Sequence, residues 1–261
     1  MTLIAVADGV GGEAGGDVAS TAAIDALAKT FSPPSFRESA RSALGDAVQQ
    51  ANAAVLEAST NVGLRRAATT LVAAAIRGRE AAVANLGDSR AYLIRGGTIR
   101  QLTSDHSGET ANSITRFLGD PRGVQPDIFV ETLQPADRLV LCSDGLTRHI
   151  SDAEVASAMS DDPDRAADAL VALARSRGGE DNITVIVYAA RRPTVSRALA
   201  GTLILALLIT VAIAGAIGAL LAAPAGGPAP ASASPSGSAP ESPSPSPSPS
   251  PTVAPTPSAS P

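Results

Sequence analysis

An uncharged stretch of 25 residues near the C-terminus limits what this chain can fold into more than any other feature. Residues 199–223 read LAGTLILALLITVAIAGAIGALLAA and contain no charged side chain. About 20 apolar residues are enough for a helix to cross a bilayer. A buried helix of a soluble domain would carry a polar face, whereas this stretch offers only Thr202 and Thr210. We therefore predict a transmembrane helix over residues 199–223 and a folded domain within residues 1–190.

The residues on either side of the predicted helix indicate its orientation. Residues 191–198 form a basic linker with three arginines, and the printed sequence has no basic residue after the helix. Because basic residues tend to stay on the cytoplasmic side, residues 1–190 are expected in the cytoplasm. Residues 224–261 are rich in Pro and Ser, with one charge, Glu241, and are expected to form a disordered extracellular tail. The expected location is the cell membrane, crossed once.

The composition argues against several classes of protein. The chain has 20 basic and 25 acidic residues and a formal charge of −5, which argues against a nucleic-acid partner. The single cysteine, Cys142, excludes an intrachain disulfide framework and is expected to fill the core. The two histidines, His106 and His149, are too few for a typical zinc site and are expected at surface or polar-network positions. Aromatic residues make up only 2%, so the core must use Ala, Val, Leu and Ile.

Apolar periodicity predicts the elements of the folded domain. Helices are predicted at residues 19–31, 35–60, 152–159 and 163–176. Strands are predicted at residues 3–7, 69–76, 81–88, 90–95, 98–103, 138–144 and 182–190. The short gaps at residues 77–79, 88–89 and 96–97 indicate antiparallel hairpins. This order of elements predicts an α+β sandwich of sheets and helices.

Three aspartates share one local design. Asp8 and Asp144 each end an apolar run and precede a glycine, and Asp181 precedes the last apolar run. Taken singly, each is explained as an ordinary turn residue. Taken together, carboxylates that converge at the rim of a sheet would repel one another unless a cation neutralised them. Oxygen ligands without His or Cys favour Mg2+ or Mn2+.

Six stretches, in order, resemble the metal-dependent protein phosphatases of the 2C type. They are VADGVGGEAGGDVAS (6–20), ATTLVAAAI (68–76), ANLGDSRAYLIRGGTIRQLTSDHS (84–107), ITRFLG (114–119), DRLVLCSDGL (137–146) and GGEDNITVIV (178–187). The resemblance implies an antiparallel β-sandwich flanked by helix pairs, with a binuclear metal centre at one end. It also implies hydrolysis of phosphoserine and phosphothreonine in proteins.

The resemblance also assigns metal ligands among the residues of this chain. Asp8 matches the carboxylate that bridges two metals, and Gly9 matches the residue that lends a backbone carbonyl to one of them. Asp144 and Asp181 match the remaining ligands of the other metal. The implied cofactors are therefore two divalent cations, Mn2+ or Mg2+. In such a centre a water held between the cations is deprotonated and attacks phosphorus.

Further positions carry over with less direct roles. Asp105 resembles the acid that helps to hold a third, weaker metal, shared with Asp144. Asn182 is expected to orient Asp181, and residues 87–89 match a strand-connecting block with a structural role. Val10 stands where some members have a histidine, so the leaving-group proton is expected from metal-bound water.

The sequence departs from the family pattern at two places. Family members carry, upstream of the strand that precedes Asp8, a segment with a phosphate-gripping arginine and an acidic metal ligand, and the printed sequence begins after it. One expectation is that the natural start lies upstream; the other is a short form with impaired catalysis. The family's helical flap is also replaced by the short segment SGETANS at residues 107–113, which affects substrate selection.

Three hypotheses for the function follow. The first is a membrane-anchored phosphatase that acts at the cytoplasmic face on phosphoproteins made by serine/threonine kinases. The second is a catalytically impaired module that keeps the fold and binds phosphoproteins or regulates a kinase pathway. The third treats the span and tail as an envelope-sensing element with the phosphatase as its output. The family resemblance favours the first.

Overall fold

The computed structural model describes residues 1–10, 13–31, 39–64, 67–108, 113–190 and 210. The predicted linker, transmembrane helix and tail lie outside the described residues, apart from Thr210. Within the described ranges, no helix is both long and apolar enough to cross a membrane.

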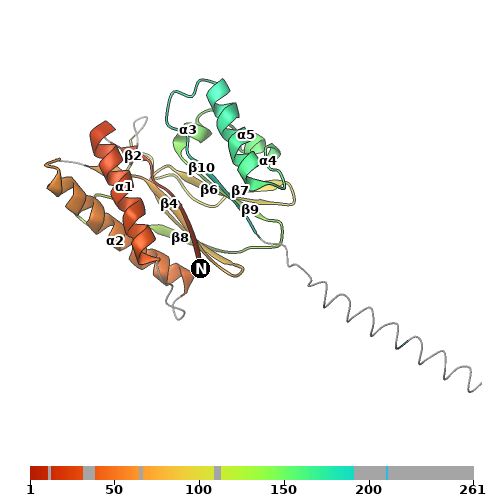
Figure 1. The fold of residues 1–261 in the computed structure, drawn as a ribbon, viewed down its shortest axis with the longest axis horizontal. Helices are drawn as coiled ribbons and strands as arrows, with labels where there is room; N and C mark the ends of the chain where they lie inside the picture. The colour runs from red at the N-terminus through yellow and green to blue at the C-terminus, as the bar shows by residue number, and fades with distance from the viewer. Residues whose placement is uncertain (11–12, 32–38, 65–66, 109–112, 191–209, 211–261) are drawn as a thin grey trace, which may run out of the picture. The chain divides into compact units, whose positions relative to one another are not determined.

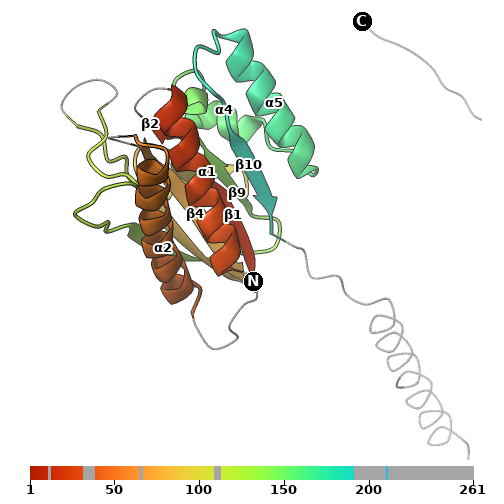
Figure 2. The same ribbon diagram turned by 60° about the vertical axis from the view of Figure 1, so that its left-hand side comes forward.

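Two four-stranded sheets form the centre of the domain (Figures 1 and 2). The first has the order β1-β4-β5-β8, with β1 (Thr2–Val6), β4 (Leu71–Arg77), β5 (Glu80–Leu86) and β8 (Asp127–Thr132). The second has the order β10-β9-β6-β7, with β10 (Val185–Ala189), β9 (Arg138–Cys142), β6 (Arg90–Arg95) and β7 (Thr98–Gln101). A short pair joins β2 (Gly9–Val10) to β3 (Ala68–Thr69). All pairings between these strands are antiparallel.

Helices cover the outer face of each sheet (Figure 1). Helices α1 (Glu13–Thr30) and α2 (Ala40–Asn61) pack against each other and against the first sheet. The second sheet is covered by α3 (Asp144–Thr147), α4 (Asp152–Ser157) and α5 (Pro163–Ser176). The predicted α+β antiparallel sandwich flanked by helices is therefore confirmed for the described domain.

The core has three apolar layers built largely from Ala, Val, Leu and Ile. Strand β4 contributes to two of them, because successive side chains point to opposite faces of a strand. Ala73 and Ala75 pack toward α1 and α2, whereas Val72 and Ile76 pack toward the second sheet. The third layer lies between the second sheet and α3–α5, and it includes Cys142. Cys142 is fully buried, so its predicted role as core filling is confirmed.

The helix predictions hold for the elements with clear caps. Helix α5 covers the predicted residues 163–176, with Asp162 as its N-cap. The apolar face predicted for α2 is fully buried, and this helix begins at Ala40, after Ser39 accepts the Ser42 N–H (3.1 Å). Helix α1 begins at Glu13, six residues before the predicted start. The glycines in that first stretch hid it, since Gly disfavours a helix interior.

The predicted strands overlap observed strands, but the predicted strand 69–76 is divided at Thr70 into β3 and β4, and one predicted connection is wrong. The gaps at residues 77–79 and 96–97 do form hairpins. Residues 88–89 do not, because β5 and β6 belong to different sheets and the turn carries the chain between them. Both strands are buried on both faces, so periodicity could not assign them to separate sheets. Strand β8 and the four-residue helix α3 were not predicted.

Candidate metal centre

Asp8 lies in the connection between β1 and β2, and its backbone is tightly held. Its N–H donates to Thr70 Oγ1 (3.0 Å), and its carbonyl accepts from the Thr70 N–H (2.8 Å) and from Thr69 Oγ1 (2.9 Å). Thr69 ends β3 and Thr70 links β3 to β4, so the connection between these two strands fixes Asp8. The Asp8 carboxyl is therefore placed by the backbone and remains available for chemistry.

Asp144 follows β9 as the first residue of α3, after the N-cap Ser143. Ser143 also joins this corner to the loop before β10. Its hydroxyl donates to the Asn182 carbonyl (3.1 Å) and accepts the Thr184 N–H (3.1 Å), and its own N–H donates to the Thr184 carbonyl (3.0 Å). The loop that carries Asp181 is thereby fastened beside Asp144.

Gly145 is required for this close approach. A Cβ atom built on Gly145 would overlap the carbonyl oxygen of Asn182, and it would also lie 3.5 Å from the Asp181 Cβ. The backbone of the 181–184 loop thus rests directly on the start of α3. The structure therefore brings the predicted residues Asp144 and Asp181 together.

The carboxyl group of Asp8 shows how strongly the acids interact. Burial, followed by the neighbouring carboxyls of Asp144, Asp181 and Asp88, together raise the pKa of Asp8 to about 7. Burial and the proximity of Asp144 also raise the pKa of Asp88. Four carboxyl groups from four separate segments therefore share one region of negative potential.

Sequence reasoning assigned no site role to Asp88. Its signal was present, because Asp88 follows the apolar run of β5 and a glycine, much as Asp8 and Asp144 end apolar runs beside a glycine. Asp88 lines a small cavity of about 210 Å³ together with Asp105, Asp144 and Arg148. The structure thus adds Asp88 to the acids of the site.

Asp105 lies on the same cavity but is held by an arginine. Arg90 Nε lies 3.0 Å from each Asp105 carboxylate oxygen, Arg90 Nη2 donates to Oδ2 (2.7 Å), and Gln101 Nε2 donates to Oδ1 (3.2 Å). A cation at this position would share Asp105 with Arg90. The role of Asp105 in a third metal site stays a prediction. The backbone N–H of Asn182 donates to Asp181 Oδ1 (2.8 Å), and the role of Asn182 in orienting Asp181 stays a prediction.

The acids fit a hard divalent cation by their chemistry. One carboxylate oxygen of Asp144, Oδ1, is buried without a hydrogen-bond partner, close to the raised-pKa carboxyl of Asp8. A buried, unpaired carboxylate oxygen is costly, and a cation would satisfy it. Across the described ranges, no three Asp, Glu, His or Cys side chains are grouped closely enough to hold an ion. Arg148 lies among these acids and pairs with Asp144 and with Asp181 (3.4 Å).

Replacing Arg148 with alanine is expected to tighten Mn2+ binding about tenfold. A guanidinium about 6 Å from a divalent cation costs about 1.4 kcal/mol even at the dielectric constant of water, which corresponds to that factor. Isothermal titration calorimetry of the chelator-treated protein measures the change. Arg177→Ala is the matched control, because Arg177 pairs with Glu154 outside the site. An unchanged Kd for the Arg148 variant would show that Arg148 does not oppose metal binding.

The remaining candidate residues have structural surroundings. His106 is buried in a polar network, as predicted, with Asp127 and Gly87 as partners. The ring of His149 lies against Gly178, away from the acids. Burial raises the pKa of the Cys142 thiol to about 12, so it is not a nucleophile at neutral pH.

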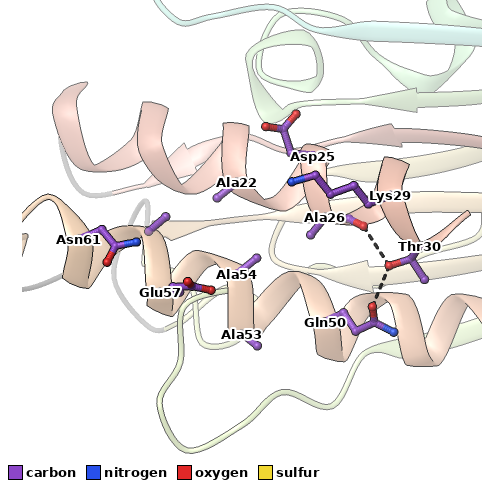
Figure 3. Close-up of a pocket in the computed structure, with 11 residues that line it drawn as sticks. Ala22, Asp25, Ala26, Lys29, Thr30, Gln50, Ala53, Ala54, Glu57 and Asn61 are labelled. Atoms are coloured by element: carbon purple, nitrogen blue, oxygen red, sulfur yellow. Dashed lines mark hydrogen bonds between the residues drawn. The ribbon is translucent and has the colours of Figure 1, made fainter. Parts of the chain in front are cut away.

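A larger groove lies elsewhere, between α1 and α2 (Figure 3). It measures about 580 Å³, and five of its eleven lining residues are alanines. Thr30 Oγ1 lies 2.9 Å from the Ala26 carbonyl and 3.0 Å from Gln50 Oε1. Its charged lining residues are Asp25, Lys29 and Glu57. Because acidic and basic groups are mixed on an open helix surface, the groove offers no convergent set of ligands.

Comparison with known proteins indicates the family of this chain. A family model described as protein phosphatase 2C matches residues 1–181. The serine/threonine phosphatase stp of Listeria welshimeri is 36% identical over 209 residues, which cover 71% of this chain and 83% of that protein.

Solved structures are similar as well. The Mycobacterium tuberculosis serine/threonine phosphatase PstP/Ppp has a TM-score of 0.67 and 31% identity, covering 73% of this chain and 88% of that one. The catalytic domain of the serine threonine protein phosphatase PstP in complex with two manganese ions has a TM-score of 0.65 and 33% identity, covering 71% and 86%.

Proposed function

The chain belongs to the protein phosphatase 2C family, and on this basis we propose that it hydrolyses phosphoserine and phosphothreonine in proteins with the help of divalent cations. The observation that carries the proposal is the buried, unpaired Asp144 Oδ1 close to the Asp8 carboxyl. The relatives named as serine/threonine phosphatases support the choice of substrate.

The residues that would hold the cations are those around this oxygen. Asp8 and Asp144 supply facing carboxylates, Asp181 lies beside them, and the carbonyl of Gly9 follows Asp8 in the chain. When bound, the cations lower the pKa of a water molecule and neutralise charge on the phosphoryl oxygens. A related structure that holds two manganese ions supports Mn2+ as a cofactor.

The chain's own groups hold the acids in place and supply a positive charge beside them. Thr69 and Thr70 fix the backbone of Asp8, and Ser143 fastens the Asp181 loop. Arg148 reaches the mouth of the acidic cavity and offers a positive charge for a phosphoryl group there. Cys142 is buried in the core and takes no part.

The enzyme is proposed to act at the cytoplasmic face of the cell membrane. The uncharged residues 199–223 and the three arginines before them support a single span with the domain inside. Phosphoproteins made by serine/threonine kinases are the proposed substrates, and the Pro- and Ser-rich residues 224–261 are proposed to lie outside the cell.

A second candidate function is a phosphoprotein-binding module with impaired catalysis. The observation that favours it is the pairing of Arg148 with both Asp144 and Asp181, which gives the acids a counter-charge without a metal. A module of this kind would bind a phosphopeptide without releasing phosphate.

A turnover assay separates the two functions. The full chain, freed of metal with a chelator, is given a phosphothreonine peptide with and without Mn2+. We expect Mn2+ to raise phosphate release at least about 100-fold, and a phosphotyrosine peptide of the same sequence to be a poor substrate. Asp144→Ala is the inactive control. A folded protein that binds Mn2+ and the phosphothreonine peptide but releases no phosphate would support the binding module instead.

A further inference from the structure

His106 makes an unusually complete set of contacts for a residue outside the cluster of acids. The side chain is buried, and its Nδ1 accepts the Gly87 N–H (3.2 Å). The backbone N–H of His106 donates to the Gly87 carbonyl (2.9 Å). Since Nδ1 accepts, the ring carries its proton on Nε2, which donates to Asp127 Oδ2 (3.0 Å). Arg116 donates to the other Asp127 oxygen (2.7 Å), and its Nη1 lies 3.3 Å from Nε2.

The segment held by His106 is the turn at residues 87–89, which crosses between the two sheets. Gly87 has a φ of +109°, and a Cβ atom there would lie 2.7 Å from the side chain of Thr70. Thr70 Oγ1 in turn bonds Ser89 Oγ (2.8 Å) and accepts the Asp8 N–H (3.0 Å). The turn is thus held between His106 on one side and Thr70 on the other, and Thr70 is the residue that holds Asp8.

Asp88 is the residue that this turn presents to the site. It lines the small acidic cavity together with Asp144, and it follows directly after Gly87. A shift of the turn would therefore move Asp88 and, through Thr70, the backbone of Asp8.

We propose that His106 is a positioning residue that clamps the turn at residues 87–89 and so holds Asp88 and Asp8 in the geometry that binds metal. His106 touches neither substrate nor metal in this scheme and acts through Gly87 and Thr70. Its link to catalysis rests on the proposed phosphatase function, whereas the effect on the turn and on metal binding does not require turnover.

Three substitutions distinguish the contact that Nδ1 makes with Gly87 from the contact that Nε2 makes with Asp127. In His106→Asn the side-chain oxygen can replace Nδ1 as the acceptor for Gly87, but the side chain is too short to reach Asp127. In His106→Gln the amide reaches toward Asp127 and the acceptor for Gly87 is lost. In His106→Leu both contacts are lost and the apolar volume is largely kept.

We expect that Mn2+ affinity and the exchange rate of residues 85–89 depend on whether residue 106 offers an acceptor for the Gly87 N–H. His106→Asn should keep the Mn2+ Kd within about threefold of the wild type, whereas His106→Gln and His106→Leu should weaken it about tenfold or more. Amide hydrogen exchange of residues 85–89 in the metal-free protein should rise in the Gln and Leu variants and remain slow in the Asn variant. In turnover assays the same two variants should lose kcat with a smaller change in KM.

The control is His149→Asn, which changes the other histidine at a position away from the cluster and should leave both measurements unchanged. Equal exchange at residues 85–89 in all three His106 variants, or an unchanged Mn2+ Kd in His106→Leu, would overturn the proposal and leave His106 with a purely structural role. Failure of the proposed function would look different: the wild-type chain would release no phosphate, while the exchange pattern of the variants would still report on the clamp.

Discussion

Replacing Asp8 with asparagine should abolish most phosphatase activity and yet stabilise the metal-free protein. Activity is expected to fall by about a thousandfold or more, because Asp8 is the carboxylate proposed to bind both cations. In the metal-free protein the same carboxyl is buried beside Asp144, Asp181 and Asp88, so its ionisation opposes folding. Removing that charge is expected to raise the free energy of unfolding by about 2 kcal/mol at neutral pH.

The pH dependence gives this expectation a definite sign. The pKa of Asp8 rises from 3.8 to about 7 in the folded chain, so the folded state binds the proton more tightly than the unfolded state. The stability contributed by the protonated group is complete below pH 3.8 and is lost as the pH rises through about 7. The advantage of Asp8→Asn over the wild type should therefore be small at pH 4 and grow up to about pH 7.

Thermal unfolding in the presence of a chelator tests the expected gain in stability, and unfolding with saturating Mn2+ tests the expected loss of metal binding. Mn2+ should raise the Tm of the wild type, since binding to the folded state alone stabilises it, and it should have little effect on Asp8→Asn. Asp46→Asn, an exposed change on α2, is the matched control and should follow the wild type. If Asp8→Asn is less stable than the wild type without metal at pH 7, the view of Asp8 as a buried carboxylate repelled by its neighbours is wrong.

The three predicted acids could be identified from the sequence because each occupies the same kind of position. Asp8, Asp144 and Asp181 each lie near the end of an apolar strand, of which β9 is buried and β1 and β10 are largely half-buried. Each also lies beside a residue that allows a tight turn, and the apolar strand fixes the direction in which the chain leaves the sheet. The pattern therefore predicts their convergence without knowledge of which strands pair. Their roles as metal ligands remain predictions that the substitutions above test.

Asp88 was overlooked because its turn was interpreted as a hairpin. A hairpin between β5 and β6 would have placed residues 88–89 within one sheet, away from the site. The alternation of side chains could not reveal the crossing, since both strands are buried on both faces. The crossing depends instead on long-range contacts of Gly87 with Thr70 and His106, which no local pattern encodes.

Strand β8 was missed for the opposite reason. It lies at the edge of the first sheet, and its residues are half-buried or exposed, with Val130 exposed by 47%. An edge strand is defined by the neighbour that it pairs with more than by its own apolar pattern. Asp127, which begins β8, is the partner of His106 and Arg116, so this edge also supports the turn at residues 87–89.

Replacing Gly145 with alanine should separate Asp144 from Asp181 while leaving both carboxylates in the chain. The added Cβ would overlap the Asn182 carbonyl, which is backbone and cannot rotate away. The loop at residues 181–184 must then move off the start of α3, and the contacts of Ser143 with Asn182 and Thr184 would be strained. We expect Mn2+ to bind at least about 100-fold more weakly, with a loss of about 2 kcal/mol in the free energy of unfolding.

Gly45→Ala is the matched control for this change. Gly45 lies inside α2, where a new Cβ would meet only Ile128 Cδ1 at an ordinary 3.6 Å. That variant should bind Mn2+ as the wild type does and gain up to about 1 kcal/mol of stability, since alanine is the better helix former. Calorimetric Kd values for the two variants decide the matter. If Gly145→Ala loses stability but keeps its Mn2+ affinity, the contact of the Asp181 loop with α3 is not needed for binding the metal.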